Sequence, residues 1–209
     1  MNWLGRFLPG QSAPAPGEAF ERWRALPEAE LGRPHSDTRY VVVNTEASGL
    51  DTEHDRLLAV AAIAVDGGLL NPLDSYHAAL EPDPAAALGG LLAFAGKAPL
   101  VVFGAAFHRN MLEAAWRQWL GDAPEFTWLD LYWLMPAVFE PGPDGPSRLA
   151  QWMKAMDVET FQRHHALGDA WAIAQLFLAL QGHATARGAA TPRALGELER
   201  TRRKLASRA

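Results

Sequence analysis

The sequence contains no cysteine, which excludes disulfide frameworks, cysteine-ligated zinc or iron–sulfur sites and thiol nucleophiles. It has no apolar run approaching the ~18 residues of a membrane-spanning helix. It also lacks a strong charge excess, because 19 Lys and Arg stand against 24 Asp and Glu. This mild acidity argues against nucleic-acid binding by bulk charge alone and leaves a local basic patch open. A hydrophobic fraction of 49% over 209 residues predicts one packed domain with appendages.

Residues 1–39 are expected to form an amino-terminal extension. Residues 1–8 carry one cation and a short apolar stretch, so we expect no secretory signal and a cytoplasmic protein. The apolar spacing there fits docking on a partner, a membrane surface or the protein's own body. Residues 9–17 are typical of a linker, and residues 18–31 of a short helix with one apolar face. The apolar residues are Trp3, Leu4, Phe7 and Leu8, and in the helix Phe20, Trp23 and Leu26.

The central region, residues 40–183, alternates between strand-like and helix-like segments. The expected strands cover 40–43, 56–65, 69–80, 99–103 and 126–129, and the expected helices 85–95, 106–120, 130–138, 147–156 and 163–181. Asp66, Gly67 and Gly68 form a hairpin signal between the second and third strands, and Ser147 is expected to cap a helix. This order predicts an α/β fold with a mixed sheet covered by helices.

Residues 184–209 end in a basic segment. Thr191 is a good N-cap and Pro192 suits a first helical position, so we expect a helix from there to about Ser207. Two interpretations stay open: a nucleic-acid contact, or a solvated basic end that the helix dipole favours. The cations are Arg193, Arg200, Arg202, Arg203, Lys204 and Arg208, against Glu197 and Glu199.

Polar residues stand at three ends of expected strands or helices. Asn44 and Glu46 are two apart, so they point to the same side of an extended strand. His108 stands where a helix begins after a strand, and His164 and Asp169 lie five apart across another helix start. Taken singly, each is also typical of ordinary structure, such as a strand-to-turn transition or an exposed histidine.

Together, the three stretches resemble the DEDDh 3′–5′ exonuclease family, which includes proofreading exonucleases, RNase T and oligoribonuclease. Residues 44–50, N-T-E-A-S-G-L, correspond to the first motif, D-x-E-T-T-G-L. Residues 104–108, G-A-A-F-H, correspond to the middle motif, N-A-x-F-D. Residues 164–170 match the last motif, H-x-A-L-x-D-A, in full. The order and spacing of the motifs agree over about two thirds of the chain.

The resemblance implies an RNase H-like fold, with a mixed five-stranded sheet and helices on both faces. It also implies four carboxylates that bind two divalent ions, Mg²⁺ or Mn²⁺, and a histidine that acts as general base toward the attacking water. On this chain, Glu46 and Asp169 are the implied metal ligands and His164 is the implied base. The implied substrate contacts are Thr45, Ala47, Leu50 and Phe107, the last two near the 3′-terminal base.

Two of the four carboxylates are replaced, since Asn44 and His108 stand at aspartate positions. A neutral amide oxygen is a poor substitute for a carboxylate that bridges two Mg²⁺ ions. The loss should weaken metal binding on the order of a thousandfold. Residues 81–99 also lack the H-G-I-type stretch with which the family contacts the terminal nucleotide. We therefore expect weak hydrolysis or none.

The replaced positions leave two interpretations of the site. Asn44, Glu46, His108 and Asp169 form a mixed nitrogen–oxygen set suited to Mn²⁺ or another transition metal. Alternatively, His108 only forms hydrogen bonds within a vestigial pocket. Asp130 follows the last expected strand, and we interpret it as a helix N-cap.

Two functions follow from the sequence. The first is an exonuclease-family protein that recognises nucleic-acid 3′ ends or nucleotides through an impaired two-metal site. The alternative is an inactive pseudo-exonuclease that binds a nucleotide, a nucleic acid or a protein partner. A homodimer is a further possibility. The tryptophans bear on the binding alternative. A helical pair such as Trp116 and Trp119 is typical of a core or a subunit interface, although aromatic rings also stack on bases.

Overall fold

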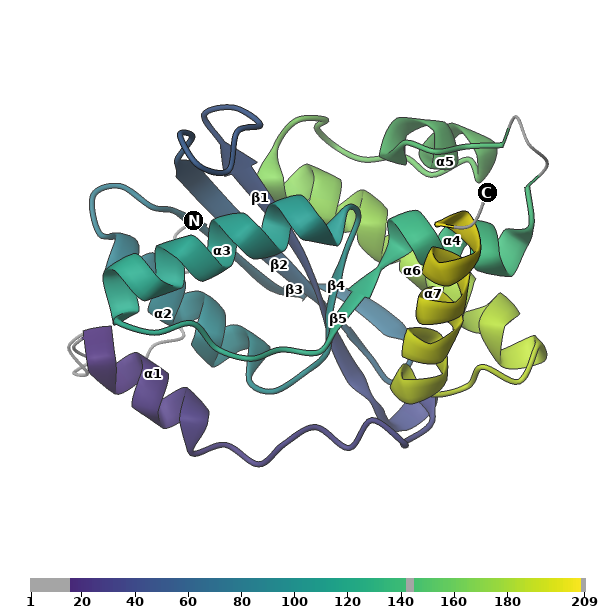
Figure 1. Cartoon of the computed structure of the whole chain (residues 1–209), viewed down its shortest axis with the longest axis horizontal. Coiled ribbons are helices and arrows are strands. Elements are labelled where there is room, and N and C mark those ends of the chain that lie inside the picture. The colour runs from purple at the N-terminus through teal and green to yellow at the C-terminus, as the bar shows by residue number, and fades with distance from the viewer. Residues whose placement is uncertain (1–15, 142–144, 208–209) are drawn as a thin grey trace.

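A computed structural model describes residues 16–141 and 145–207 (Figure 1). The expected docking residues Trp3, Leu4, Phe7 and Leu8, nearly all of the expected linker, and Arg208 lie outside these ranges. Within them, no helix combines the length and the apolar character that crossing a membrane would need.

Five strands form one mixed sheet in the order β3-β2-β1-β4-β5. β1, β2 and β3 pair antiparallel, whereas β4 runs parallel to both β1 and β5. The mixed five-stranded sheet predicted from the sequence is therefore confirmed. The strands are β1 (Arg39–Ala47), β2 (Leu57–Asp66), β3 (Leu69–Ala79), β4 (Leu100–Val102) and β5 (Trp128–Asp130).

Helices cover both faces of the sheet, as expected, because two apolar clusters form on its opposite sides. α1, α2 and α3 contribute to one cluster, and α4, α5, α6 and α7 to the other. The helices are α1 (Pro16–Arg24), α2 (Pro84–Ala95), α3 (Ala105–Leu120), α4 (Leu131–Phe139), α5 (Leu149–Ala155), α6 (Ala166–Ala186) and α7 (Pro192–Ala206), with a 3₁₀ turn at His35–Asp37.

The alternation of side chains along β1 decides which polar residues meet. Val41 and Val43 pack in the cluster with α2 and α3, whereas Tyr40 and Val42 pack in the cluster with α6. Since successive strand residues point to opposite faces, Asn44 and Glu46 belong to the α6 face, and the residue between them belongs to the α3 face.

The hairpin between β2 and β3 turns at Gly67 and Gly68, as the sequence predicted. Both glycines have positive φ angles, of 58° and 74°. Such angles suit glycine, which lacks a Cβ, and they match the twist of a tight two-residue hairpin.

Two helices begin later than their sequence patterns predicted. The helix expected from residue 163 begins at Ala166, because His164 has a φ of 56° and His165 is extended. The expected cap Ser147 is wrong: Arg148 occupies the N-cap position of α5. The side chain of Gln151 satisfies that helix start by accepting hydrogen bonds from the Ser147 and Arg148 amides, at 2.9 and 3.0 Å.

The amino-terminal helix is shorter than predicted. α1 ends at Arg24, and Leu26 is 42% exposed instead of lying on the apolar face. The residue before a proline is disfavoured in helical conformation, and Pro27 follows directly. Phe20 and Trp23 are buried as expected, and the indole of Trp23 donates a hydrogen bond to the Gly96 carbonyl.

The helical tryptophan pair predicted to be a core or interface feature divides between core and surface. Trp116 is fully buried on α3, whereas Trp119 is 42% exposed on the same helix. The core interpretation therefore holds for Trp116 alone.

Candidate functional site

Glu46 and Asn44 both contact the start of α6. A carboxylate oxygen of Glu46 accepts a hydrogen bond from the Ala166 amide, and the Asn44 amide donates to the Ala166 carbonyl at 3.4 Å. The first amides of a helix have no partner within the helix, so an anionic side chain stabilises them. Both side chains of the first motif are thus occupied in holding the last motif against β1.

Asp169 lies in the first turn of α6 and forms an ion pair with Arg163. Burial raises the pKa of Asp169, while the neighbouring Arg163 and His164 act to lower it. Arg163 directly precedes the last motif and belongs to none of the three motifs, so no sequence signal marks it. Its guanidinium places a cation of the chain itself beside a carboxylate that the resemblance assigns to a metal.

His164, the implied general base, is exposed and has a left-handed backbone conformation. The next residue, His165, stacks on His77 with ring centroids 5.1 Å apart. Burial lowers the pKa of His77, the neighbouring His165 lowers it further, and Glu46 acts to raise it. His77 was missed in the sequence because β3 carries no motif. Strand pairing brings His77 next to the first motif, because Asn44 of β1 pairs with Ala61 of β2, and Ala61 pairs with His77 of β3.

His108 lies on the other face of the sheet from Asn44 and Glu46. Its Nδ1 is hydrogen-bonded to the Thr45 hydroxyl at 2.8 Å, and both side chains are buried. Burial lowers the pKa of His108 to about 4, an effect that the Phe103 carbonyl partly opposes. This geometry supports the interpretation of His108 as a hydrogen-bonding residue. The same hydrogen bond engages the hydroxyl of Thr45, an implied substrate residue.

This burial predicts a pH-dependent stability. Between about pH 4 and pH 6.5 the unfolded chain binds a proton at His108 that the folded chain does not, so stability present at neutral pH is lost as the pH falls. The expected loss is on the order of 3 kcal/mol, measured by urea unfolding at a series of pH values. His108→Asn keeps an acceptor near Thr45 and should flatten the profile. An unchanged slope in that variant would contradict the prediction, since His35 and His77 remain in both proteins.

The other implied substrate residues follow or end β1, or follow β4, at the carboxyl edge of the sheet. Leu50 is 87% exposed in the loop after β1, whereas Ala47 and Phe107 are half-buried. The Phe107 ring meets the His108 ring edge-on, with centroids 5.5 Å apart. These positions leave Leu50 and Phe107 accessible to a ligand at the carboxyl edge of the sheet.

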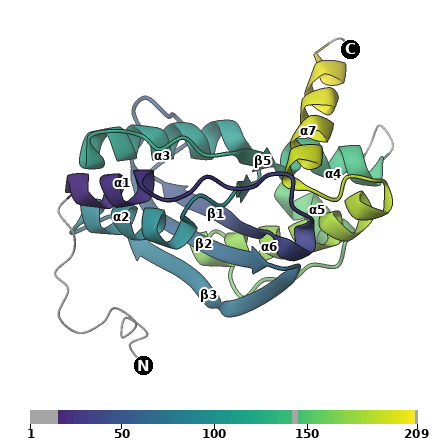
Figure 2. The ribbon, with the colours of Figure 1, turned by 90° about the horizontal axis from the view of Figure 1, so that it is seen from below.

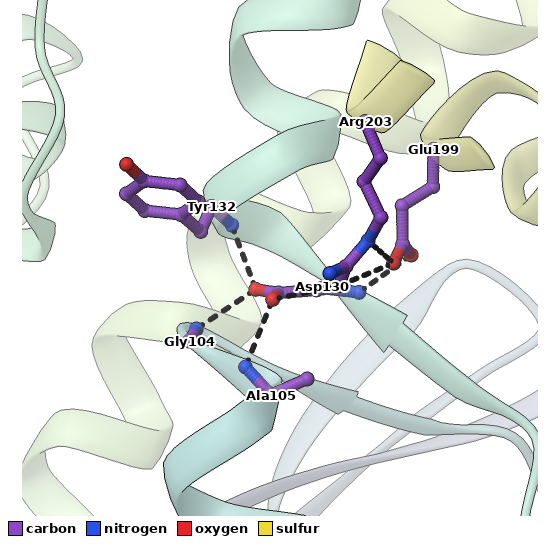
Figure 3. Close-up of polar contacts among 6 residues, drawn as sticks. All are labelled: Gly104, Ala105, Asp130, Tyr132, Glu199 and Arg203. Atoms are coloured by element: carbon purple, nitrogen blue, oxygen red, sulfur yellow. Dashed lines mark hydrogen bonds and ion pairs between the residues drawn. The ribbon is translucent and has the colours of Figure 1, made fainter. Parts of the chain in front are cut away.

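Asp130 ends β5 and joins three elements (Figure 3). Its carboxylate accepts hydrogen bonds from the Tyr132 amide at 3.0 Å and from the Gly104 and Ala105 amides at 2.8 and 2.9 Å. Arg203 of α7 donates to the same carboxylate at 3.2 Å. The interpretation of Asp130 as the N-cap of α4 is confirmed. The same carboxylate also accepts hydrogen bonds from the amides at the start of α3, which was not predicted.

Glu199 completes this cluster from α7. It accepts a hydrogen bond from the Asp130 amide at 2.9 Å and pairs with Arg203 at 2.8 Å. Burial raises the pKa of Glu199, while those two partners act to lower it. Thr191 caps α7 as predicted, accepting from the Ala194 amide at 3.2 Å. The cluster therefore fixes α7 to the carboxyl end of the sheet.

Three of the residues that the resemblance assigns to metal ions have partners within the chain. Glu46 is bonded to a helix amide, Asp169 to Arg163, and His108 to Thr45 on the other face. In the described ranges, no three His, Asp or Glu side chains are grouped so that they would hold a metal ion. Two magnesium ions need several free, hard oxygen ligands in near-octahedral arrangement.

Two cavities lie at the opposite edge of the sheet, before β4 and β5 begin. Their volumes are about 720 and 400 Å³. Lys97 lines both and is already partnered, because its ammonium lies 3.5 Å from the centroid of the Trp23 ring and 2.8 Å from Glu28. Neither cavity is lined by a residue of the three motifs.

The fold is shared with solved exonuclease structures. E. coli exonuclease I in complex with a dT13 oligonucleotide superposes with a TM-score of 0.53 at 16% identity, over 71% of this chain and 42% of that one. The same enzyme with a dA16 oligonucleotide gives 0.54 at 16% identity, over 77% and 42%. Exonuclease X in complex with 5′-overhanging duplex DNA gives 0.52 at 16% identity, over 77% and 99%.

No protein-family model and no curated protein match the sequence. The chain matches less than half the length of the exonuclease I structures. At this level of identity the structural likeness establishes the fold, which is the RNase H-like α/β fold of these exonucleases.

Proposed function

We propose that this protein binds the 3′ end of single-stranded nucleic acid and hydrolyses it weakly or not at all. Neighbours of the same fold were solved with oligonucleotides or DNA bound. The resemblance of the last motif to the DEDDh exonucleases indicates the same edge of the sheet as the binding position.

The ion pair between Arg163 and Asp169 carries this proposal. Four free carboxylates without metal ions would repel a phosphate strongly. Here Asn44 and His108 replace two of them, and Arg163 offsets a third, so the edge is much less anionic. An arginine also offers donors that match phosphate oxygens. Phosphate binding at this edge then depends on groups of the chain itself.

The same contacts argue against efficient hydrolysis. The metals of the family lower the pKa of an attacking water and stabilise the displacement at phosphorus. One oxygen of each carboxylate that would hold them here already has a partner, because Glu46 accepts from the Ala166 amide and Asp169 pairs with Arg163. A general base at the exposed His164 would need a metal-activated water, and weak metal binding would not supply one.

The test uses the full chain and a fluorescently labelled single-stranded oligonucleotide. We expect anisotropy to report binding of equal strength in EDTA, Mg²⁺ and Mn²⁺, with no mononucleotide released. An unlabelled strand with a free 3′ hydroxyl should compete better than one with a blocked 3′ end. Arg163→Gln should weaken binding about tenfold. Arg187→Gln is the matched control, because Arg187 forms an exposed ion pair with Glu140 just after the other end of α6.

Metal-dependent release of mononucleotides that Asp169→Ala abolishes would contradict the absence of efficient hydrolysis. It would favour the exonuclease with an unusual metal site, and restoring aspartates by Asn44→Asp with His108→Asp should then increase the rate. Lack of binding to any oligonucleotide would contradict the whole proposal.

A further inference from the structure

The end of α7 contacts the rest of the described chain through Arg203, which bonds to Asp130 and lies over Trp133. Residues 201–207 are all exposed, and Figure 2 shows this end of the helix projecting from the body. Arg200, Arg202 and Lys204 are exposed there, whereas the ion pairs that the structure describes on this helix involve Arg203. Arg200 and Lys204 are four residues apart, so their like charges lie on one face of the helix and repel each other, and an anionic partner would stabilise them.

Aromatic rings lie against the same part of the helix. The Arg203 guanidinium lies 5.2 Å from the centroid of the Trp133 ring. Tyr132 meets Trp133 edge-on at 4.9 Å, and Phe103 meets Tyr132 edge-on at 6.2 Å. Tyr132 is 41% exposed, and Figure 3 shows its ring pointing away from Asp130. Tyr132 is thus an exposed ring next to Trp133, over which a cation lies, and a ring with a cation nearby suits a nucleotide, which carries both a base and a phosphate.

This surface lies at the same edge of the sheet as the candidate site. β1, β4 and β5 are parallel, so their carboxyl ends share one edge. Glu46 is near the end of β1, and Asp130 ends β5 and is bonded to Arg203. Phe103 directly follows β4, so it lies between the two along that edge.

We propose that the distal half of α7, together with Tyr132, binds the single strand beyond its 3′ end. In this arrangement Arg200, Arg202 and Lys204 contact phosphates, and one base stacks on Tyr132. The inference rests on the proposed function, which supplies the strand at the neighbouring site. An acidic protein segment would match the cations but leave the exposed aromatic ring without a stacking partner.

The test measures the affinity of the full chain for labelled oligo-dT in EDTA at several salt concentrations. Arg200→Gln, Arg202→Gln and Lys204→Gln combined should weaken binding at least about tenfold and make the salt dependence shallower by about 2 in log–log slope. Tyr132→Ala should weaken binding about tenfold, and Tyr132→Phe, which keeps the ring, should not. Arg22→Gln, Arg24→Gln and Arg117→Gln combined change the net charge equally on α1 and α3 and serve as the control.

Equal weakening by the two triple variants would overturn this inference, as would equal effects of the two Tyr132 variants. Either result, with normal binding by the unchanged protein, would leave the proposed function standing and make α7 a solvated basic end. Displacement of the oligonucleotide by polyglutamate at similar concentrations would overturn it in favour of an acidic protein partner. If the unchanged chain binds no oligonucleotide, both proposals fail.

Discussion

Asp130→Ala should lower the free energy of unfolding by about 4 kcal/mol. The substitution leaves the Gly104 and Ala105 amides without an acceptor, and it removes one partner of Arg203. Asp130 is only 3% exposed, so water does not readily replace the lost carboxylate. Urea unfolding followed by circular dichroism measures the effect.

Asp122→Ala is the matched control for this prediction. Asp122 is 60% exposed and pairs with Arg24 at 3.6 Å, an interaction that solvent screens. We expect a change of about 0.5 kcal/mol or less. Similar effects of the two substitutions would show that the Asp130 cluster (Figure 3) contributes little beyond a surface ion pair.

Gly168→Ala should disrupt the segment that leads into the last motif. A Cβ at Gly168 would lie far inside the van der Waals radius of the Gln162 carbonyl oxygen, which is backbone and cannot rotate away. It would also crowd Thr160, whose hydroxyl donates to the Gly168 carbonyl at 2.6 Å. We expect a loss of about 3 kcal/mol of unfolding free energy or more. Because His164 and Arg163 lie in this segment, oligonucleotide affinity should fall with it.

The control for this prediction lies on the same helix. Gly182 also belongs to α6, and a Cβ there would meet nothing within 4 Å. Gly182→Ala should therefore raise the free energy of unfolding by about 1 kcal/mol, through helix propensity alone. Equal destabilisation by both substitutions would mean that the close packing at Gly168 is not the cause.

Local patterns along the chain predicted most of the architecture. The hairpin glycines, the apolar strands and the N-caps Thr191 and Asp130 act over a few residues, so they can be read from neighbouring positions. The predicted starts of the helices near His164 and Ser147 were wrong. In both places a backbone conformation or a competing side chain, Gln151 in the second, outweighs the apolar spacing.

By itself, the sequence determined the order of the elements, the alternation along β1 and the absence of two of the four expected carboxylates. Only the tertiary structure decided which groups meet: Glu46 with the Ala166 amide, His108 with Thr45, and Asp130 with α7. These partners are between 63 and 120 residues apart in the chain. Their pairing depends on the strand register and on which face of the sheet each helix covers, and no local pattern encodes either.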